Sequence, residues 1–457
     1  MLTSKQLKHP LPYFADSARL FSPLADKPWS VFLDSGYPKS SQGRFDIIAA
    51  GPLCTLVTQG EQTEIRHGGH CVISREDPFE LLKQQLGEKK QSIDHLPFNG
   101  GALGYFSYDL ARRLEKLPII AEDAEHIPEM AVGIYSWAVI IDHKRQESWL
   151  VGHETQEDDW ETLIDQFSLL PAYPELGQFQ VLDKPCSNMD KEDYAKAFAK
   201  IKHYLKEGDS YQVNLAQRFV SHCSGDPWLA YQQLRKINAA PFSAYINFPE
   251  VRVLSSSPER FLKVTDGEVE TKPIKGTRPR KLLLDQDRLQ ISALSASLKD
   301  RAENVMIVDL LRNDISKNCR KGSVTVPKLF AVESYATVHH LVSTIKGMLA
   351  EGHHALDLLR GCFPGGSITG APKIRSMEII EELEPNRRGV YCGAIGYIGF
   401  DGNMDTNIAI RTLVHSDDMI RFWAGGGIVN DSVLEEEYQE SFDKAAALLE
   451  LLEYFRH

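Results

Sequence analysis

The stretch GAIGYIGFDGNMDTNIAIRTLV (Gly393–Val414) decides the fold of this chain. Asp401-Gly402 lies between two runs of strand-forming residues, and an Asp-Gly pair in that setting predicts a β-hairpin. FLKVTDGEVETKPI repeats the pattern around Asp266-Gly267. Hairpins join antiparallel strands, and the chain lacks the regular strand–helix alternation of a parallel sheet. We therefore expect large antiparallel sheets.

Helical segments are interleaved with these strands. Asp190 is a good N-cap for a helix that runs to Lys206, because Gly208 then stops it, and Asp226-Pro227 opens a second helix. Further helical patterns cover Gln290–Ser316, Lys373–Leu383 and Val433–Tyr454. The predicted fold class is α+β, with large antiparallel β-sheets in a sandwich and helices packed outside.

The composition is that of a globular protein with an acidic surface. Of 457 residues, 42% are hydrophobic and 25% charged, and 51 Lys and Arg oppose 63 Asp and Glu, a formal net charge of −12. Such a chain has no general attraction to nucleic acid or anionic membranes, so we expect neither as a partner. An anionic substrate would need a local cationic pocket.

Segments that direct a protein to a membrane or an oxidising compartment are not expected here. The longest apolar stretch, residues 130–141, is far shorter than the roughly 20 residues that span a bilayer, and MLTSKQLKHPLPYF lacks the apolar core of a signal peptide. The seven cysteines are odd in number and contain no CxxC, which argues against disulfides and zinc. We expect a soluble, cytoplasmic protein.

Carboxylates recur three residues apart in two predicted helices, as Asp300 with Glu303 and as Glu437 with Glu440. Residues at that spacing share one helix face. Two such faces in opposition would form an oxygen-rich site suited to Mg²⁺. The alternative, which spacing alone favours, is a pair of solvated acidic faces.

Lys275 and Glu259 are candidate chemical groups. As a nucleophile Lys275 must lose a proton, which costs about 4.6 kcal/mol at pH 7 with an ordinary pKa near 10.4. Burial, or the charges of Lys272 and Arg278, would lower that cost. Glu259 follows Pro258 at the end of a strand, where a carboxylic acid can protonate a leaving group. The alternatives are a surface lysine and an ion pair between Glu259 and its neighbour Arg260.

Motifs in a fixed order between Gly208 and Lys444 carry a resemblance to a known family. They are GDSYQVNLAQR, SSSPERF, PIKGT, KDRAENVMIVDLLRND, HHLVS, FPGGSITGAPK, GNMDTNIAIRT, AGGGIV and EEEYQESFDKA. Together they resemble the chorismate-utilising enzymes, which include anthranilate, isochorismate, salicylate and aminodeoxychorismate synthases. FLDSG and GRFDI are similar to that family's N-terminal half.

The resemblance implies the chorismate-binding enzyme fold and two regions. Residues 189–457 would be the chorismate-binding catalytic region, and residues 1–170 would resemble the N-terminal region of anthranilate synthase component I. Between them, PAYPELGQFQVLDKPCSN (Pro171–Asn188) is rich in Pro and Gly and lacks periodicity, so we expect a linker there.

Within this family, the residue before Gly-Thr indicates the chemistry. Anthranilate synthases have Ala there, whereas a lysine, here Lys275, is the mark of aminodeoxychorismate synthases. The resemblance implies that Lys275 attacks C2 of chorismate while the C4 hydroxyl leaves with a proton from Glu259. Ammonia then adds at C4 and expels the lysine. The expected product is 4-amino-4-deoxychorismate, an intermediate on the way to 4-aminobenzoate and folate.

By the same matching, Mg²⁺ is the expected cofactor. Glu303 and Glu440 would bind it directly, with Asp300 and Glu437 acting through water. The metal would hold the ring carboxylate of chorismate against Gly427. The full set of matched substrate-binding positions is His340, Ser367, Tyr391, Arg411, Gly425, Gly426, Gly427 and Lys444.

The N-terminal resemblance implies a site for L-tryptophan. Its matched positions are Ser35, Gln42, Gly43, Arg44, Phe45, Pro241, Phe242 and Ser243. The usual Leu-Leu-Glu-Ser is Phe-Leu-Asp-Ser here, ending at Ser35, so we expect a structural site rather than feedback inhibition.

The source of ammonia is not visible in the sequence. A glutamine amidotransferase needs a cysteine in a Gly-x-Cys-x-Gly turn, and none of the seven cysteines has that setting. We therefore expect a separate glutamine amidotransferase subunit as partner. Two alternative functions stay open, an anthranilate or isochorismate synthase and a catalytically silent, tryptophan-binding interaction subunit.

Overall fold

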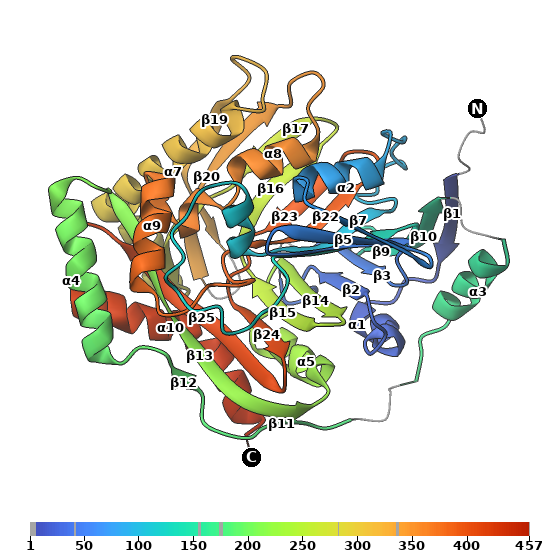
Figure 1. Ribbon diagram of the computed structural model, residues 1–457, viewed down its shortest axis with the longest axis horizontal. Helices are drawn as coiled ribbons and strands as arrows, with labels where there is room; N and C mark the ends of the chain where they lie inside the picture. The colour runs from blue at the N-terminus through green and yellow to red at the C-terminus, as the bar shows by residue number, and fades with distance from the viewer. Residues whose placement is uncertain are drawn as a thin grey trace.

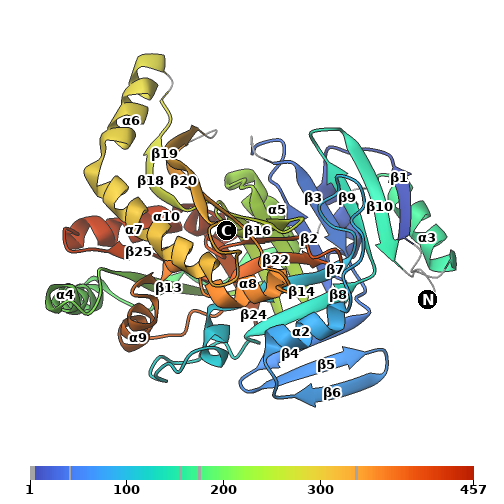
Figure 2. The ribbon, with the colours of Figure 1, turned by 90° about the horizontal axis from the view of Figure 1, so that it is seen from above.

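Two antiparallel sheets lie face to face in the computed structural model, and the helices pack on their outer faces (Figures 1 and 2). The structure describes residues 6–40, 43–153, 157–172, 177–281, 283–334 and 338–456. The α+β prediction, with sheets in a sandwich, is confirmed.

The first sheet contains thirteen strands within the described residues. In spatial order they are β1 (Gln6–Leu11), β10 (Glu147–His153), β9 (Trp137–Asp142), β3 (Phe45–Ala49), β2 (Ser30–Asp34), β14 (Phe242–Phe248), β15 (Val251–Ser257), β24 (Thr412–Ser416), β25 (Met419–Ile428), β13 (Gln212–Gly225) and β11 (Phe179–Val181). Two short strands, β12 (Cys186–Ser187) and β21 (Gly370–Ala371), also pair with β13.

The second sheet contains twelve strands by the same count of described residues. Their order is β18 (Ile274–Pro279), β20 (Val338–Met348), β17 (Glu268–Thr271), β16 (Arg260–Thr265), β23 (Met404–Asn407), β22 (Ala394–Gly399), β7 (Gly101–Phe106), β8 (Met130–Tyr135), β4 (Cys54–Gln59), β5 (Gln62–His67) and β6 (His70–Ser74), with β19 (Thr325–Ser334) beside β20. Both sheets combine strands of residues 1–170 with strands of residues 189–457.

The core lies in layers. Ile140 and Ile246 of the first sheet share one buried cluster with Leu56 of the second. On the outer face of the first sheet, Phe422 packs with Leu448 in a second cluster. The helices and 3₁₀ turns are α1 (Ser17–Phe21), η1 (Ser22–Leu24), α2 (Pro78–Leu86), η2 (Tyr108–Arg113), α3 (Glu157–Ser168), α4 (Lys191–Glu207), α5 (Pro227–Ile237), α6 (Leu284–Ala296), α7 (Leu298–Ser316), α8 (Ala355–Cys362), η3 (Gly366–Ile368), α9 (Lys373–Leu383) and α10 (Leu434–Tyr454).

The local turn and cap signals are confirmed. Asp266-Gly267 joins β16 to β17, and Asp401-Gly402 lies between β22 and β23. Asp190 caps α4 by accepting a hydrogen bond from the backbone N–H of Asp193, and Gly208 ends this helix with a φ of 84°. Figure 2 shows α4, α9 and α10 gathered at the end of the sheets opposite β1 and α3.

Two segments differ in detail from what the sequence predicted. The helix expected over Gln290–Ser316 is two helices, because Ser297 breaks it with a ψ of 109° and caps α7 through the N–H of Asp300. The segment Pro171–Asn188 is not a free linker, since its described residues include β11 and β12, which pair with β13. None of the helices in the described part of the chain is long and apolar enough to cross a membrane.

Candidate active site

Three candidate groups meet where β18, η3 and the start of β16 come together. The Nζ of Lys275 donates a hydrogen bond to the backbone carbonyl of Ser367 at 3.2 Å. The hydroxyl of Ser367 donates to Oε1 of Glu259 at 3.1 Å. One serine therefore bridges the lysine and the carboxylic acid, the two candidate chemical groups.

The alternative explanations of these two residues do not hold. Glu259 is 8% exposed, and Arg260 is bonded to Asp405 at 2.9 Å instead of to Glu259. Lys275 is half-buried, and its charge is close enough to Glu259 to act on the pKa of that carboxyl. The two side chains are thus near each other and at least partly withdrawn from bulk water.

Burial shifts the two pKa values in the directions that catalysis needs. Desolvation raises the pKa of Glu259 against the opposing charge of Lys275, so the acid holds its proton longer. Desolvation lowers the pKa of Lys275, although the carboxylates of Glu303 and Glu259 oppose this. The nearby cation that lowers it further is Lys444, whereas Lys272 and Arg278 form ion pairs with other residues, Glu333 and Asp300.

A second cluster lies over the glycine strand β25. The Nζ of Lys444 is 2.7 Å from Oε1 of Glu440 and donates to the carbonyl of Gly425 at 2.9 Å. A Cβ on Gly426 would lie 3.3 Å from Oε2 of Glu437 and 3.4 Å from Oε1 of Glu440. Two carboxylates and an ammonium therefore converge on the bare backbone of Gly426, where an anionic group and a cation can meet.

Neighbouring atoms leave little room for a side chain at the two flanking glycines, Gly425 and Gly427. A Cβ on Gly425 would come within 2.1 Å of the carbonyl of Leu215, and one on Gly427 within 2.5 Å of Nε2 of Gln212. Both clashing groups belong to β13, which pairs with β25 along this stretch. Close strand packing thus excludes a side chain at Gly425, whereas at Gly427 the side chain of Gln212 would have to move.

The carboxylates in this region suit a hard divalent cation. Glu303 is half-buried on α7, where the charges of Lys275 and Lys299 act on its carboxylate. Burial raises the pKa of Glu303, with further contributions from Asp300 and Glu437, and burial also raises the pKa of Glu437. Burial would raise the pKa of Glu440 as well, but the charge and hydrogen bond of Lys444 hold it below its ordinary value. A divalent cation would relieve this mutual repulsion.

The matched acidic residues are not drawn together into a finished metal site. Among the described residues, no group of three or more His, Cys, Asp or Glu side chains is close enough to hold a metal ion. Asp300 pairs with Arg278 at 3.1 Å, and Glu437 accepts a hydrogen bond from Ser432 at 2.6 Å. These partners would have to be exchanged or shared when a cation is bound.

Three further matched positions are wholly or partly buried, and one of them contacts the strand that carries Lys275. His340 contacts Thr277 beside the lysine strand, at 2.8 Å between Nδ1 and Oγ1. Burial and the charge of Arg411 lower the pKa of His340 to about 4, so its ring is neutral at physiological pH. Arg411 adopts a φ of 49°. Burial of its guanidinium lowers the pKa of this side chain. Tyr391 is buried, and burial raises its pKa well above the ordinary value.

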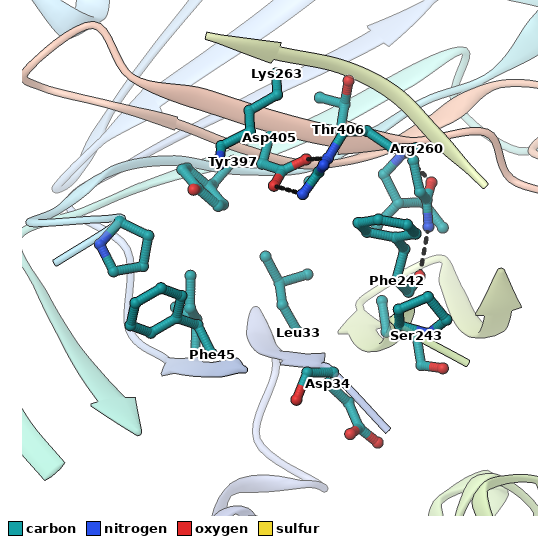
Figure 3. A pocket seen from close by; sticks show the side chains of 18 of the residues that line it. Leu33, Asp34, Phe45, Phe242, Ser243, Arg260, Lys263, Tyr397, Asp405 and Thr406 are labelled. Carbon is teal, nitrogen blue, oxygen red and sulfur yellow. Dashed lines mark hydrogen bonds and ion pairs between the residues drawn. The ribbon is translucent and has the colours of Figure 1, made fainter. Parts of the chain in front are cut away.

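A separate cavity of about 340 Å³ lies between the sheets, near the matched tryptophan positions (Figure 3). Six of those positions line it, namely Ser35, Arg44, Phe45, Pro241, Phe242 and Ser243. Gly43 lies against the backbone of Ser35, and Gln42 is outside the described residues. Figure 3 shows Arg260 and Asp405 bonded to each other on the opposite wall.

Two buried residues behind the site, Arg388 and Glu384, belong to none of the motifs that predicted site residues. Arg388 and Glu384 form an ion pair at 2.6 Å behind the loop that carries Ser367. Their i, i+4 spacing was a visible signal, but such pairs are common on helix surfaces. Their burial depends on tertiary packing that the spacing does not reveal.

Comparison with known proteins gives a consistent set of relatives. The family model described as chorismate binding enzyme matches residues 31–450. The chain is 50% identical to aminodeoxychorismate synthase component 1 of Klebsiella aerogenes over 447 residues, covering 97% of this chain and 98% of the relative. It is 50% identical to the Escherichia coli protein of the same name, with 95% of each covered.

Solved structures agree with this. Anthranilate synthase component I of Streptococcus pneumoniae superposes with a TM-score of 0.80 at 31% identity, covering 89% of this chain and 92% of that one. The menaquinone-specific isochorismate synthase of Escherichia coli superposes with a TM-score of 0.74 at 18% identity, covering 98% and 94%, which shows the shared fold alone.

Proposed function

This chain belongs to the family of chorismate binding enzymes, and we propose that it converts chorismate and ammonia to 4-amino-4-deoxychorismate. The observation that carries the proposal is the bridge from Lys275 through Ser367 to Glu259. Relatives named aminodeoxychorismate synthase component 1 match nearly the whole chain, which supports the same activity and a role in the supply of folate.

The reaction uses Lys275 as a covalent nucleophile. Its neutral amine forms a bond to C2 of chorismate as the ring double bond shifts and the C4–O bond breaks. Glu259 gives its proton to the departing oxygen, which leaves as water. Ammonia then forms a bond to C4 and loses a proton that restores the acid form of Glu259, while the double bond shifts back and the C2–N bond to lysine breaks. Chorismate and ammonia thus yield the amino product and one water.

The protein prepares both partners of this exchange. The carbonyl of Ser367 orients the amine of Lys275, and its hydroxyl orients Glu259. Because both groups are held in place, less entropy is lost on reaching the transition state. The lowered pKa of Lys275 makes the free amine more available, and the raised pKa of Glu259 favours the protonated acid. His340 stays neutral beside them.

Mg²⁺ is part of the proposal. Glu303 and Glu440 would hold it, with Asp300 and Glu437 in supporting positions, and it would neutralise the ring carboxylate beside Gly427. Lys444, Arg411 and Tyr391 would bind the enolpyruvyl carboxylate. Mg²⁺, Lys444 and Arg411 would thus form the local cationic pocket that an acidic protein needs in order to bind a doubly charged anion.

Two binding partners complete the proposal. A glutamine amidotransferase subunit would supply ammonia, which fits the name component 1 carried by the relatives. L-tryptophan would occupy the cavity shown in Figure 3, where Phe45 and Phe242 offer apolar walls and Ser35 and Ser243 offer polar groups. We expect it to stabilise the fold there.

The test is the identity of the product. Purified protein with chorismate, ammonium and Mg²⁺ should give 4-amino-4-deoxychorismate by chromatography and mass spectrometry. Formation of anthranilate or isochorismate would favour the neighbouring activities of the family. An absence of turnover under these conditions would favour a silent binding subunit, and the proposal would be wrong.

A further inference from the structure

The geometry assigns Arg388, together with Glu384, the role of a positioning pair that sets the Ser367 loop against Lys275 and Glu259. This inference rests on the proposed function, because it concerns the same two reacting groups. The side chain of Arg388 is 1% exposed and Glu384 is 4% exposed, so the pair is among the most deeply buried charges of the described chain.

The guanidinium of Arg388 donates hydrogen bonds to one carboxylate and to two backbone carbonyls. Its Nε and Nη2 donate to the two carboxylate oxygens of Glu384 at 2.9 and 2.6 Å. Its Nη1 donates to the carbonyl of Ile368 at 2.9 Å, and Nη2 also reaches the carbonyl of Asn214 at 3.3 Å. Ile368 follows Ser367 directly, so the guanidinium holds the peptide next to the one whose carbonyl contacts Lys275.

The pair occupies a gap at the edge of β13. The short strand β21 covers this edge at Gln212 and Val213 and then ends. Beyond it, the carbonyl of Asn214 is met by Arg388, and the N–H of Ala216 donates to Glu384 at 2.9 Å. Residues two apart in a strand present their backbone groups to the same edge. The ion pair thus continues the hydrogen-bond ladder that β21 begins.

This position links the pair to the rest of the site. Asn214 and Ala216 lie opposite Gly427 and Gly425 in the pairing of β13 with β25. The carbonyl of Arg388 accepts the N–H of Tyr391 at 3.1 Å, and its guanidinium lies 5.8 Å from the Tyr391 ring centroid. One buried ion pair therefore fixes the Ser367 loop, the strand facing the glycines and a substrate-binding tyrosine.

Stability alone is a poor explanation for this pair. Burying two charges costs desolvation energy, and an apolar pair of similar volume is often as stable. A planar guanidinium, however, can hold a carboxylate and two carbonyls in one fixed arrangement, which a lysine ammonium cannot reproduce. The position therefore calls for arginine because of where it places its partners.

The experiment is a double-mutant cycle of Arg388→Lys with Ser367→Ala, measured as chorismate consumption at saturating ammonium and Mg²⁺. We expect Arg388→Lys to lower kcat by roughly 100-fold, as misplaced reacting groups do, with little change in KM. In the Ser367→Ala background the same change should cost less, because the hydroxyl contact through which the loop orients Glu259 is already lost and only the backbone contact to Lys275 is left to disturb.

Arg218→Lys is the matched control. Arg218, on β13, is likewise a largely buried arginine, but its guanidinium pairs with Glu125 rather than with Glu384 and the carbonyl of Ile368. The factor by which Arg218→Lys changes kcat should simply multiply with the factor for Ser367→Ala. This should hold even if Arg218→Lys lowers the melting temperature. Glu384→Gln keeps an acceptor for the N–H of Ala216 and replaces Arg388→Lys in the cycle if the latter fails to fold.

If the kcat change of the Arg388 or Glu384 variant simply multiplies with that of Ser367→Ala, the inference is overturned. An unchanged kcat in Arg388→Lys would overturn it too. Loss of folding in Glu384→Gln as well would also overturn it, because the pair would then be structural. Failure of the proposed function shows differently, as another product from the unaltered chain.

Discussion

The side chain of Lys275 donates a hydrogen bond to the backbone carbonyl of Ser367, whereas the side-chain hydroxyl of Ser367 donates one to Glu259. Replacing the serine would therefore remove the contact to the acid and leave the contact to the lysine. Because that hydroxyl lowers the pKa of Glu259, its loss should raise this pKa further and keep the acid protonated to higher pH. The two reacting groups can thus be perturbed separately.

Without ammonia, the enzyme should accumulate an adduct on Lys275. Intact-protein mass after incubation with chorismate and Mg²⁺, quenched by acid within the first turnovers, should rise by chorismate less one water. Peptide mapping should place the added mass on Lys275. Lys275→Ala should show none, and Lys275→Arg should be less active than Ala, because guanidinium stays protonated and fills the space.

Lys272→Ala is the control for that experiment, since Lys272 is a nearby lysine engaged with Glu333 at 2.7 Å. It should still form the adduct. Residual amination by Lys275→Ala should shift toward C2, as in anthranilate synthases. Unaltered amination at C4 by that variant would sink the covalent mechanism and leave the family assignment intact.

Removing a carboxylate from the acidic cluster should abolish the response to Mg²⁺. Glu303→Gln or Glu440→Gln should lose activity and also lose the Mg²⁺-dependent rise in melting temperature, because each removes a hard charged ligand. Asp300→Asn and Glu437→Gln should weaken Mg²⁺ affinity by roughly 10- to 100-fold, as supporting residues do. Asp309→Asn, on the same helix as Glu303 but 79% exposed, is the control. A normal Mg²⁺ response in Glu303→Gln would remove that residue from the site.

The chain alone should use ammonium salts but not glutamine. Product formation should rise with pH at fixed total ammonium, because more of it is then free ammonia that can attack C4. Adding the partner amidotransferase should restore glutamine-dependent turnover. Glutamine use by the pure single chain would reveal an amidotransferase site within it.

L-tryptophan should raise the melting temperature of the protein without inhibiting it. A ligand that binds the folded state stabilises it by RT ln(1 + [L]/Kd), so the shift should grow with concentration. Ser243→Phe should fill part of the cavity and abolish the shift while the fold is retained. Strong inhibition by tryptophan would instead show that the cavity is coupled to catalysis.

Acid should destabilise the fold partly through His340. Its folded-state pKa is about 4 against an ordinary 6.5, so the unfolded chain binds more protons between these values. Stability contributed by the neutral ring is present above about pH 6.5 and is lost as pH falls toward 4, by at most about 1.4 kcal/mol per pH unit. Denaturant unfolding of His340→Gln should show a free energy of unfolding that depends less on pH than that of the unaltered chain; an equally steep dependence would contradict the prediction.

Local signals in the sequence predicted most of the fold. Asp-Gly turns and the Asp190 and Gly208 caps act within a few residues, and they are where they were expected. The break at Ser297 was also readable, because Ser297 precedes Asp300 by three residues in the spacing of a capping box. A continuous helical pattern on both sides concealed it.

The site was predictable in its members but not in its contacts. Lys275 and Glu259 were identified by motif, yet their link runs through Ser367, which is 92 positions from the lysine and 108 from the acid. The Arg388–Glu384 pair depends on a gap in a β-ladder that exists only once β21 has formed. Such arrangements arise from tertiary packing rather than from local propensity.

The covered edge of β13 has a consequence for the behaviour of the protein at high concentration. A fourteen-residue strand with an open edge is a template on which another chain can add a strand, the first step of aggregation. Here β21, the Arg388–Glu384 pair, the side chain of Asn188, β12 and β11 occupy that edge in succession. The ion pair behind the catalytic loop therefore also protects the chain against edge-to-edge association with its own copies.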